Sequence, residues 1–162
     1  MTKLVANLEN FMDQASCQYY RLVILVGIPS SGKTDILQLL ADKVGCRVVN
    51  VNFELSKRML ELTRSQRSRQ VERILKDVIA EDPSKVVLLD NLEILFDNSL
   101  EVDPLRLLQA SSRNRTIVAS WNGRYESGAL SYAEPGHPEY VQYKDSDVLA
   151  ATIVESTMLS RG

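Results

Sequence analysis

Apolar runs alternate with stretches of helical periodicity along the whole chain. Five short runs rich in Val, Ile and Leu, or in Tyr and Val, predict strands near residues 22–26, 47–51, 86–90, 116–119 and 139–143. The intervals between them are long enough for helices. Strands that alternate with helices form parallel sheets covered on both faces. The pattern therefore predicts an α/β fold with three α/β/α layers around a mostly parallel five-stranded sheet.

Helical spacing is clearest in two segments. Residues 4–15 place Leu4, Leu8, Phe11 and Ala15 on one face, which predicts a helix packed on the sheet or on a neighbouring subunit. Residues 34–44 show the same spacing and follow the first predicted strand directly. No repeat, low-complexity tract or linker divides the chain, so we expect residues 1–162 to form a single domain.

The turn between that strand and helix carries the most specific motif. Residues 27–34 read G-I-P-S-S-G-K-T, which is a complete G-x-x-x-x-G-K-[ST] phosphate-binding loop. Glycines allow the loop to curl its N–H groups around phosphate oxygens, and the helix N-terminus adds a favourable dipole. The predicted phosphate-binding residues are Gly27, Ile28, Pro29, Ser30, Ser31, Gly32, Lys33, Thr34 and Asp35.

A second motif supplies the expected metal ligand. Residues 86–91 read V-V-L-L-D-N, a buried strand that ends in the carboxylate of Asp90. Four apolar residues before an aspartate are common, but after a phosphate loop they indicate a Walker B strand. We therefore expect Thr34 and Asp90 to hold Mg²⁺ beside the phosphates of ATP.

Composition limits the classes of protein that fit. The 162 residues are 44% hydrophobic and 25% charged with a formal net charge of −2, which argues against a protein that is basic overall and coats nucleic acid. The two cysteines, Cys17 and Cys46, have no metal-ligand spacing, and His137 is the sole histidine. No signal peptide or membrane-spanning run is apparent, so we expect a cytoplasmic protein with reduced thiols.

The strand order and its polar tips resemble the additional-strand P-loop ATPases, which include the AAA+ and RecA-like families. The resemblance implies that Ser120 or Asn122, at the end of the strand after Asp90, contacts the γ-phosphate or orients water. The alternative for either residue is a capped strand end. Those families usually place glutamate directly after the aspartate, whereas this chain has Asn91, which cannot accept a proton. Glu93, two residues further on, is the candidate to replace this glutamate as the base, unless its side chain faces solvent.

The resemblance also fails at the C-terminus. Only residues 144–162 follow the last predicted strand, so we expect an AAA+-like core without the C-terminal helical lid. A neighbouring subunit of a homo-oligomer would then close the site and supply an arginine to the γ-phosphate. Arg124 is the first candidate for this role, and Arg113 and Arg115 are the alternatives.

Three further segments have open interpretations. Residues 57–76 predict one or two amphipathic helices whose basic face is either solvated or in contact with DNA phosphates or an acidic partner. Residues 127–138 predict a loop that reorders on nucleotide binding or assembly. Tyr19 and Tyr20 are candidates to flank the base, or to pack in the core.

The complete set of motifs resembles the BrxF family, the small P-loop proteins of type 3 BREX bacteriophage-exclusion systems. The resemblance rests on the phosphate loop, V-V-L-L-D-N, the A-S-W-N-G segment at 119–123 and E-Y-V-Q-Y at 139–143. It implies an antiviral nucleotide-binding protein that works beside other BREX proteins. Two functions stay open: an ATPase that oligomerises, and a nucleotide-gated subunit that hydrolyses little. A small-molecule phosphotransferase is the weakest alternative because the lid is missing.

Overall fold

A parallel sheet forms the centre of the molecule in the computed structural model, which describes residues 2–144 and 146–153. The core strands lie in the order β2-β3-β4-β1-β7, and every neighbouring pair along this path is parallel. Their bounds are Leu22–Gly27 for β1, Val48–Asn50 for β2, Val86–Asp90 for β3, Thr116–Glu126 for β4 and Leu149–Thr152 for β7. The predicted α/β fold with a mostly parallel sheet is confirmed, although the sheet of the described residues has seven strands in place of five, two of which, β5 and β6, are antiparallel.

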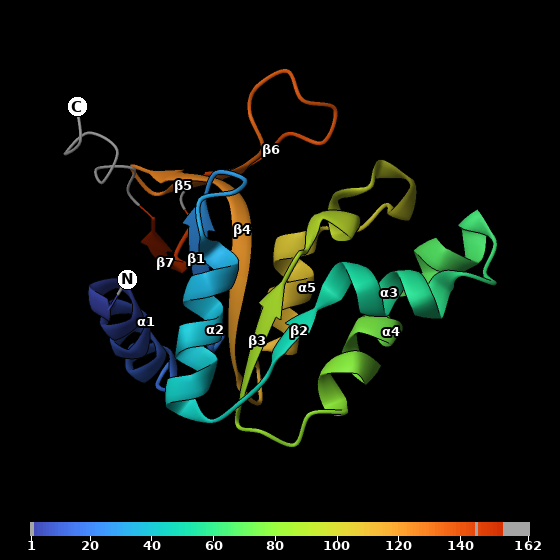
Figure 1. The fold of residues 1–162 in the computed structure, drawn as a ribbon. Coiled ribbons are helices and arrows are strands. Elements are labelled where there is room, and N and C mark those ends of the chain that lie inside the picture. The colour runs from blue at the N-terminus through green and yellow to red at the C-terminus, as the bar shows by residue number, and fades with distance from the viewer. Residues whose placement is uncertain (1, 145, 154–162) are drawn as a thin grey trace.

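Helices cover both faces of this sheet (Figure 1). One face is covered by α1 (Thr2–Ala15) and α2 (Lys33–Val44), whose apolar side chains pack on Val23, Leu25 and Leu88. The other face is covered by α3 (Val51–Met59), α4 (Arg64–Ala80), α5 (Pro104–Ser111) and the short 3₁₀ helices η1 (Glu93–Phe96) and η2 (Asn98–Leu100). The expected N-terminal helix therefore packs against the sheet through buried Val5 and Leu8.

The fifth strand differs from the prediction. Residues 139–143 were expected to complete the parallel sheet, but only β6 (Val141–Tyr143) forms there, and it pairs antiparallel with β5 (Ala129–Tyr132). The strand beside β1 is instead β7, whose sequence Leu-Ala-Ala-Thr has no β-branched or aromatic residue before its last position. Burial against β1 overrides this weak strand propensity.

The segment 127–138 is also more ordered than predicted. Strand β4 continues past the core sheet, and β5 folds back on it in antiparallel register, with Gly123 opposite Tyr132. A Cβ at Gly123 would overlap the carbonyl of Ser131, so glycine allows the close approach of these strands. The Tyr132 ring stacks on Phe96, with 3.4 Å between centroids, which anchors the hairpin to the core.

Two boundaries have local causes. The predicted strand 47–51 ends earlier, at Asn50, because the Asn50 side chain accepts a hydrogen bond from the N–H of Phe53 and so begins α3. Between Lys144 and Ile153 the described residues contain strand β7 and no helix, in agreement with a core that lacks a lid there. The remainder of the expected lidless segment, 154–162, lies outside the described residues. No helix in the described part of the chain is long and apolar enough to cross a membrane.

Candidate functional site

The loop between β1 and α2 has the backbone that its glycines predict. Gly32 adopts a φ of 98°, a left-handed conformation that side chains with a Cβ rarely tolerate, and precedes the first residue of α2. At Gly27 a Cβ would overlap the hydroxyl of Ser31. The loop therefore presents the N-terminus of α2 and its N–H groups to the open end of the sheet.

Lys33 is folded over this loop. Its ammonium group donates to the carbonyl of Gly27 at 3.0 Å and to that of Ile28 at 2.7 Å. Burial lowers the pKa of Lys33 below its usual 10.5, although the carboxylates of Asp90 and Glu93 act in the opposite direction. The charge thus lies near the two acids of the site, at the centre of the loop that is expected to hold phosphate.

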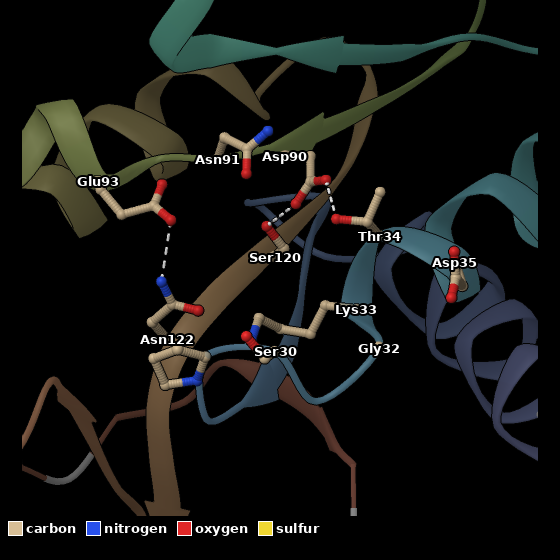
Figure 2. A pocket seen from close by; sticks show the side chains of 11 residues that line it. Ser30, Gly32, Lys33, Thr34, Asp35, Asp90, Asn91, Glu93, Ser120 and Asn122 are labelled. Atoms are coloured by element: carbon tan, nitrogen blue, oxygen red, sulfur yellow. Dashed lines mark hydrogen bonds between the residues drawn. The ribbon is translucent and has the colours of Figure 1, made fainter.

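Two hydroxyl groups and a carboxylate form a hydrogen-bonded chain that links α2, β3 and β4 (Figure 2). The Thr34 hydroxyl donates to Asp90 Oδ2 at 2.6 Å, and the Ser120 hydroxyl donates to Asp90 Oδ1 at 2.6 Å. Asp90 and Ser120 are both buried. These two hydrogen bonds join Thr34 of the phosphate loop to Asp90 and Ser120, which the sequence predicts at the ends of separate strands.

Glu93 points into the same site. Its Oε1 accepts from the side-chain amide of Asn122 at 3.0 Å, and its Oε2 accepts from that of Asn52 at 3.2 Å. Asn52 is itself fixed, because its Oδ1 accepts from the N–H of Ile94 at 2.7 Å. Two amides therefore hold the carboxylate, which does not point to solvent.

A cavity of about 470 Å³ joins these groups. Of the sequence-predicted residues, it is lined by Pro29, Ser30, Gly32, Lys33, Thr34, Asp35, Asp90, Glu93, Ser120 and Asn122. Gly27, Ile28 and Ser31 shape the loop behind the cavity through contacts with Lys33. Arg124 is not among the lining residues. Its guanidinium pairs with Glu134 at 3.1 Å, and both side chains are more than half exposed.

Comparison with known proteins identifies the family. Residues 23–117 match the family described as ATPase family associated with various cellular activities (AAA), which is more than half of the chain. The chain belongs to the AAA family. It is thus an AAA+ ATPase-like nucleotide-binding module. No curated protein gives a significant match to this sequence.

Solved structures of AAA-like architecture are also similar, at low identity. The structure of C. elegans PCH-2 has 18% identity and a TM-score of 0.43 over 94% of this chain and 40% of that chain. The replication initiator DnaA bound to AMPPCP and single-stranded DNA has 17% identity and a TM-score of 0.40, over 71% and 36% of the two chains. AMPPCP-bound DnaA from Aquifex aeolicus has 19% identity and a TM-score of 0.38, over 70% of this chain and 35% of that chain. The chain spans two fifths or less of each of these proteins.

The position after Asp90 has a left-handed backbone conformation. Asn91 has a φ of 55°, which asparagine tolerates better than most residues with a Cβ. Its carbonyl accepts the N–H of Asn52 at 2.9 Å. This left-handed turn carries the chain into η1 and delivers Glu93, two residues later, to the cavity.

The donors present suit Mg²⁺ held mainly by a nucleotide. Thr34 Oγ1 and Asp90 are in contact, and the described residues contain no group of three or more acidic, histidine or cysteine side chains that would form a metal site on their own. Mg²⁺ is usually held by one or two carboxylates together with phosphate oxygens and water. Thr34 and Asp90 fit such a shared site.

The structure corrects the assignment of the tyrosines to the base and locates the two alternative arginines. Tyr19 and Tyr20 precede β1, and Arg113 and Arg115 precede β4, so all four lie at the amino ends of strands whose carboxyl ends form the cavity. A six-residue strand spans about 20 Å at ~3.3 Å per residue, which removes the tyrosines from the phosphate site. Arg115 is also held by the carbonyls of Ile79 and Asp82. A role of either arginine on the nucleotide of a neighbouring subunit stays a prediction.

One residue of the site was missed. Asn52 lies just after β2, the neighbour of β3, and parallel strands place their carboxyl ends at one edge. The same rule locates Asn52 once the strand is known to end at Asn50, whereas the predicted strand runs to residue 51.

Proposed function

We propose that this chain binds and hydrolyses ATP as an AAA+-like module whose active site is completed by a second copy. The observation that carries the proposal is the single cavity in which Lys33, the Thr34–Asp90–Ser120 hydrogen-bonded chain and Glu93 converge. These groups bind phosphate, hold Mg²⁺ and orient water. We take adenine as the base because the sequence has no N-K-x-D guanine-reading motif.

Each group has a proposed task. Lys33 and the N–H groups of residues 30–34 bind the β- and γ-phosphates, and Thr34 with Asp90 would hold Mg²⁺, which neutralises phosphate charge when it is bound. Ser120 keeps Asp90 in place, and Asn122 is close enough to Glu93 to share a water with it. Glu93 takes the proton of the attacking water, in place of the missing acid at Asn91.

The composite site rests on Arg124. The residue is on the outer part of β4, and its side chain is 54% exposed with a single partner, Glu134. An exposed ion pair contributes only about 0–1 kcal/mol, so Arg124 can exchange Glu134 for the γ-phosphate of a neighbour at little cost. We therefore propose a homo-oligomer in which Arg124 of one copy acts on the nucleotide of the next.

A nucleotide-gated subunit that hydrolyses little is the second candidate. Asn91 favours it, because the usual position of the general base is occupied by an amide on a left-handed turn. In that case ATP would fix the binding of the chain to DNA, through residues 57–76, or to a larger ATPase. Part of that basic segment is neutralised, since Lys57 and Arg58 both pair with Glu54 and Arg58 also pairs with Glu81.

The proposed biological setting is a bacterial BREX anti-phage system in the cytoplasm. It is supported by the resemblance of the loop, the V-V-L-L-D-N strand and the A-S-W-N-G segment to the BrxF family. Residues of A-S-W-N-G include Ser120 and Asn122, so the segment that carries the resemblance also lines the cavity. The other BREX proteins are the proposed partners.

The test measures molecular mass by light scattering and phosphate release, with and without Mg-ATP. We expect ATP to drive assembly and release per subunit to increase with protein concentration, with both lost in Lys33→Ala. ATP binding that leaves a monomer with negligible release would overturn the ATPase proposal in favour of the nucleotide-gated subunit. ATP binding that persists unchanged in Lys33→Ala would overturn both.

A further inference from the structure

A second hollow lies at the opposite edge of the sheet from the nucleotide site. Three cavities of about 510, 590 and 140 Å³ adjoin one another there. The first two share Lys76, Ala110 and Arg113, and the last two share Tyr20 and Gln109. We call this row of cavities the amino-edge groove. It begins between the last turns of α4 and α5 and ends at the turn before β1.

The amino-edge groove is predominantly basic. Its lining includes Lys76, Arg106, Arg113 and Arg115, against two carboxylates, Glu72 and Asp147. Within the part of the chain that the structure describes, no carboxylate oxygen pairs with the charged nitrogens of Lys76, Arg106 or Arg113. These cations contrast with Lys57 and Arg58 on α3, which have acidic partners.

The negative C-terminal ends of the nearby helices do not neutralise the positive charge of the amino-edge groove. The C-termini of α4 and α5 both face the first cavity, and each carries a partial charge of about −0.5. Arg115 already satisfies two carbonyls at the end of α4, those of Ile79 and Asp82. Lys76 and Arg113 in the same cavity therefore remain as surplus positive charge.

Aromatic side chains adjoin these cations. The Arg113 guanidinium lies 3.8 Å from the centroid of the Tyr19 ring, and Tyr19 meets Tyr20 edge to face at 4.8 Å. Tyr19 is 63% exposed and Tyr20 is 39% exposed, although neither contributes to the core. The N–H of Arg21 donates to the carbonyl of Ser112 at 2.9 Å, which ties the tyrosine turn to the arginine turn. The aromatic and basic groups are thus held together by the backbone.

We infer that the amino-edge groove binds single-stranded nucleic acid, with phosphates at Lys76, Arg106 and Arg113 and bases stacked at Tyr19 and Tyr20. Exposed aromatic rings beside unpaired cations are the combination by which proteins hold single strands without reading their sequence. Duplex DNA offers the same phosphates but keeps its bases inside, so it gives the two tyrosines nothing to stack on. An acidic peptide would likewise pair with the cations but would not stack on the tyrosine rings.

This site is separate from the phosphate loop, and Lys76 is the one basic residue that it shares with the segment 57–76 proposed above for DNA. It lies at the start of β1 and β4, whereas the loop lies at the end of β1, so loss of one site leaves the other intact. The inference does not depend on ATP hydrolysis.

The test is fluorescence anisotropy of a labelled 15-nucleotide oligo(dT) with the full chain across a range of salt concentrations. Three phosphate contacts predict a slope of log affinity against log salt of about −2. The double variant Lys76→Ala/Arg113→Ala is expected to reduce the slope to about −0.7, since one contact remains. Tyr20→Ala is expected to weaken binding roughly fivefold to hundredfold without a change in slope.

The matched control removes the same charge elsewhere. Lys3→Ala/Lys144→Ala, on α1 and directly after β6, lies outside both the groove and the segment 57–76, and is expected to bind oligo(dT) within twofold of the wild type. All altered residues are exposed, and unchanged thermal melting and ATP affinity show that each variant is folded. The inference is overturned if the control loses affinity and the groove variants do not, if a duplex binds equally well regardless of Tyr20, or if poly-glutamate displaces oligo(dT) at an equal or lower concentration.

Discussion

Asn122 donates a hydrogen bond from its side-chain amide to Glu93 Oε1 at 3.0 Å, and so fixes an acid of the cavity other than Asp90, the partner of Thr34. The two residues come from β4 and η1, which are brought together by the sheet and by the turn at Asn91. The bond places an amide and a carboxylate side by side. Together they form an arrangement that can hold a water molecule and remove its proton.

Glu93→Gln tests this arrangement. Glutamine keeps the size of the side chain and a hydrogen-bonding oxygen but cannot accept a proton, so we expect phosphate release to fall by about 10²–10⁴ with ATP affinity little changed. Binding is measured by calorimetry and release in a coupled assay. Glu61→Gln, which alters an exposed acid in the turn after α3, is the control and should match the wild type. Equal rates for Glu93→Gln and wild type would show that Glu93 is not the base.

Ser120→Ala should reduce stability as well as activity. Its hydroxyl donates to Asp90 Oδ1, and both residues are buried, so alanine leaves a carboxylate oxygen without its partner. We expect a loss of about 1–3 kcal/mol in the free energy of unfolding. Urea denaturation measures the change. Ser111→Ala, which removes only a bond to the preceding helical turn, is expected to be nearly neutral. A neutral Ser120→Ala would mean that this bond contributes nothing to the site.

The dependence of ATP affinity on pH should reflect the deprotonation of Lys33. Phosphate binds the protonated amine, and burial lowers the pKa of that amine below 10.5. Deprotonation therefore begins at a lower pH than for an exposed lysine, and ATP affinity should fall on the alkaline side before pH 10.5, by about tenfold per pH unit above the lowered pKa. Calorimetry from pH 7 to 10 measures this.

The control for the pH profile is Lys33→Ala, which has no amine to titrate. Its residual affinity should be low and flat over the same range. A decrease that persists in Lys33→Ala would come from another group, and an affinity of the wild type that stays flat to pH 10 would contradict the lowered pKa.

Arg124→Ala should remove catalysis and leave folding intact. The Arg124–Glu134 pair is exposed, so we expect a change of less than about 1 kcal/mol in unfolding free energy, while phosphate release falls by about 10³–10⁵ if the guanidinium acts on the γ-phosphate of a neighbour. Arg69→Ala, an exposed arginine of α4, is the control for loss of charge.

Mixing two inactive variants separates a role in trans from a role in cis. Lys33→Ala retains Arg124 but cannot hold phosphate, and Arg124→Ala retains the phosphate loop. A mixture of the two should recover release, because some interfaces join an intact loop to an intact arginine. No recovery, in a mixture shown by light scattering to co-assemble, would place Arg124 in its own site or outside catalysis.

The phosphate site was predictable because its residues obey local rules. The glycine loop has a fixed spacing, and Asp90, Ser120 and Asn122 each end a run of strand residues, so a parallel sheet must bring them to one edge. The contact of Glu93 was not predictable, since it depends on the backbone turn at Asn91, which no spacing rule encodes.

Elements with weak local signals were the ones misjudged. β7 gains its strand conformation from pairing with β1 and not from its composition, so the sequence favoured the richer run Val141–Tyr143 instead. The tyrosines before β1 were considered for the base because they are near the loop in sequence. A strand separates its two ends by its full length, and proximity along the chain is then misleading.

The extension of β4 beyond the sheet has a mechanical consequence. Ser120, Asn122 and Arg124 alternate along one continuous strand, about 7 Å apart at successive steps, and β5 braces the outer half. A continuous strand that is paired along its outer half would transmit a displacement along its length without a hinge. If Arg124 acts on the nucleotide of a neighbour, as proposed, then Asn122 in the cavity and Arg124 would shift together, so the occupancy of one pocket would be relayed to the next subunit through the covalent backbone itself.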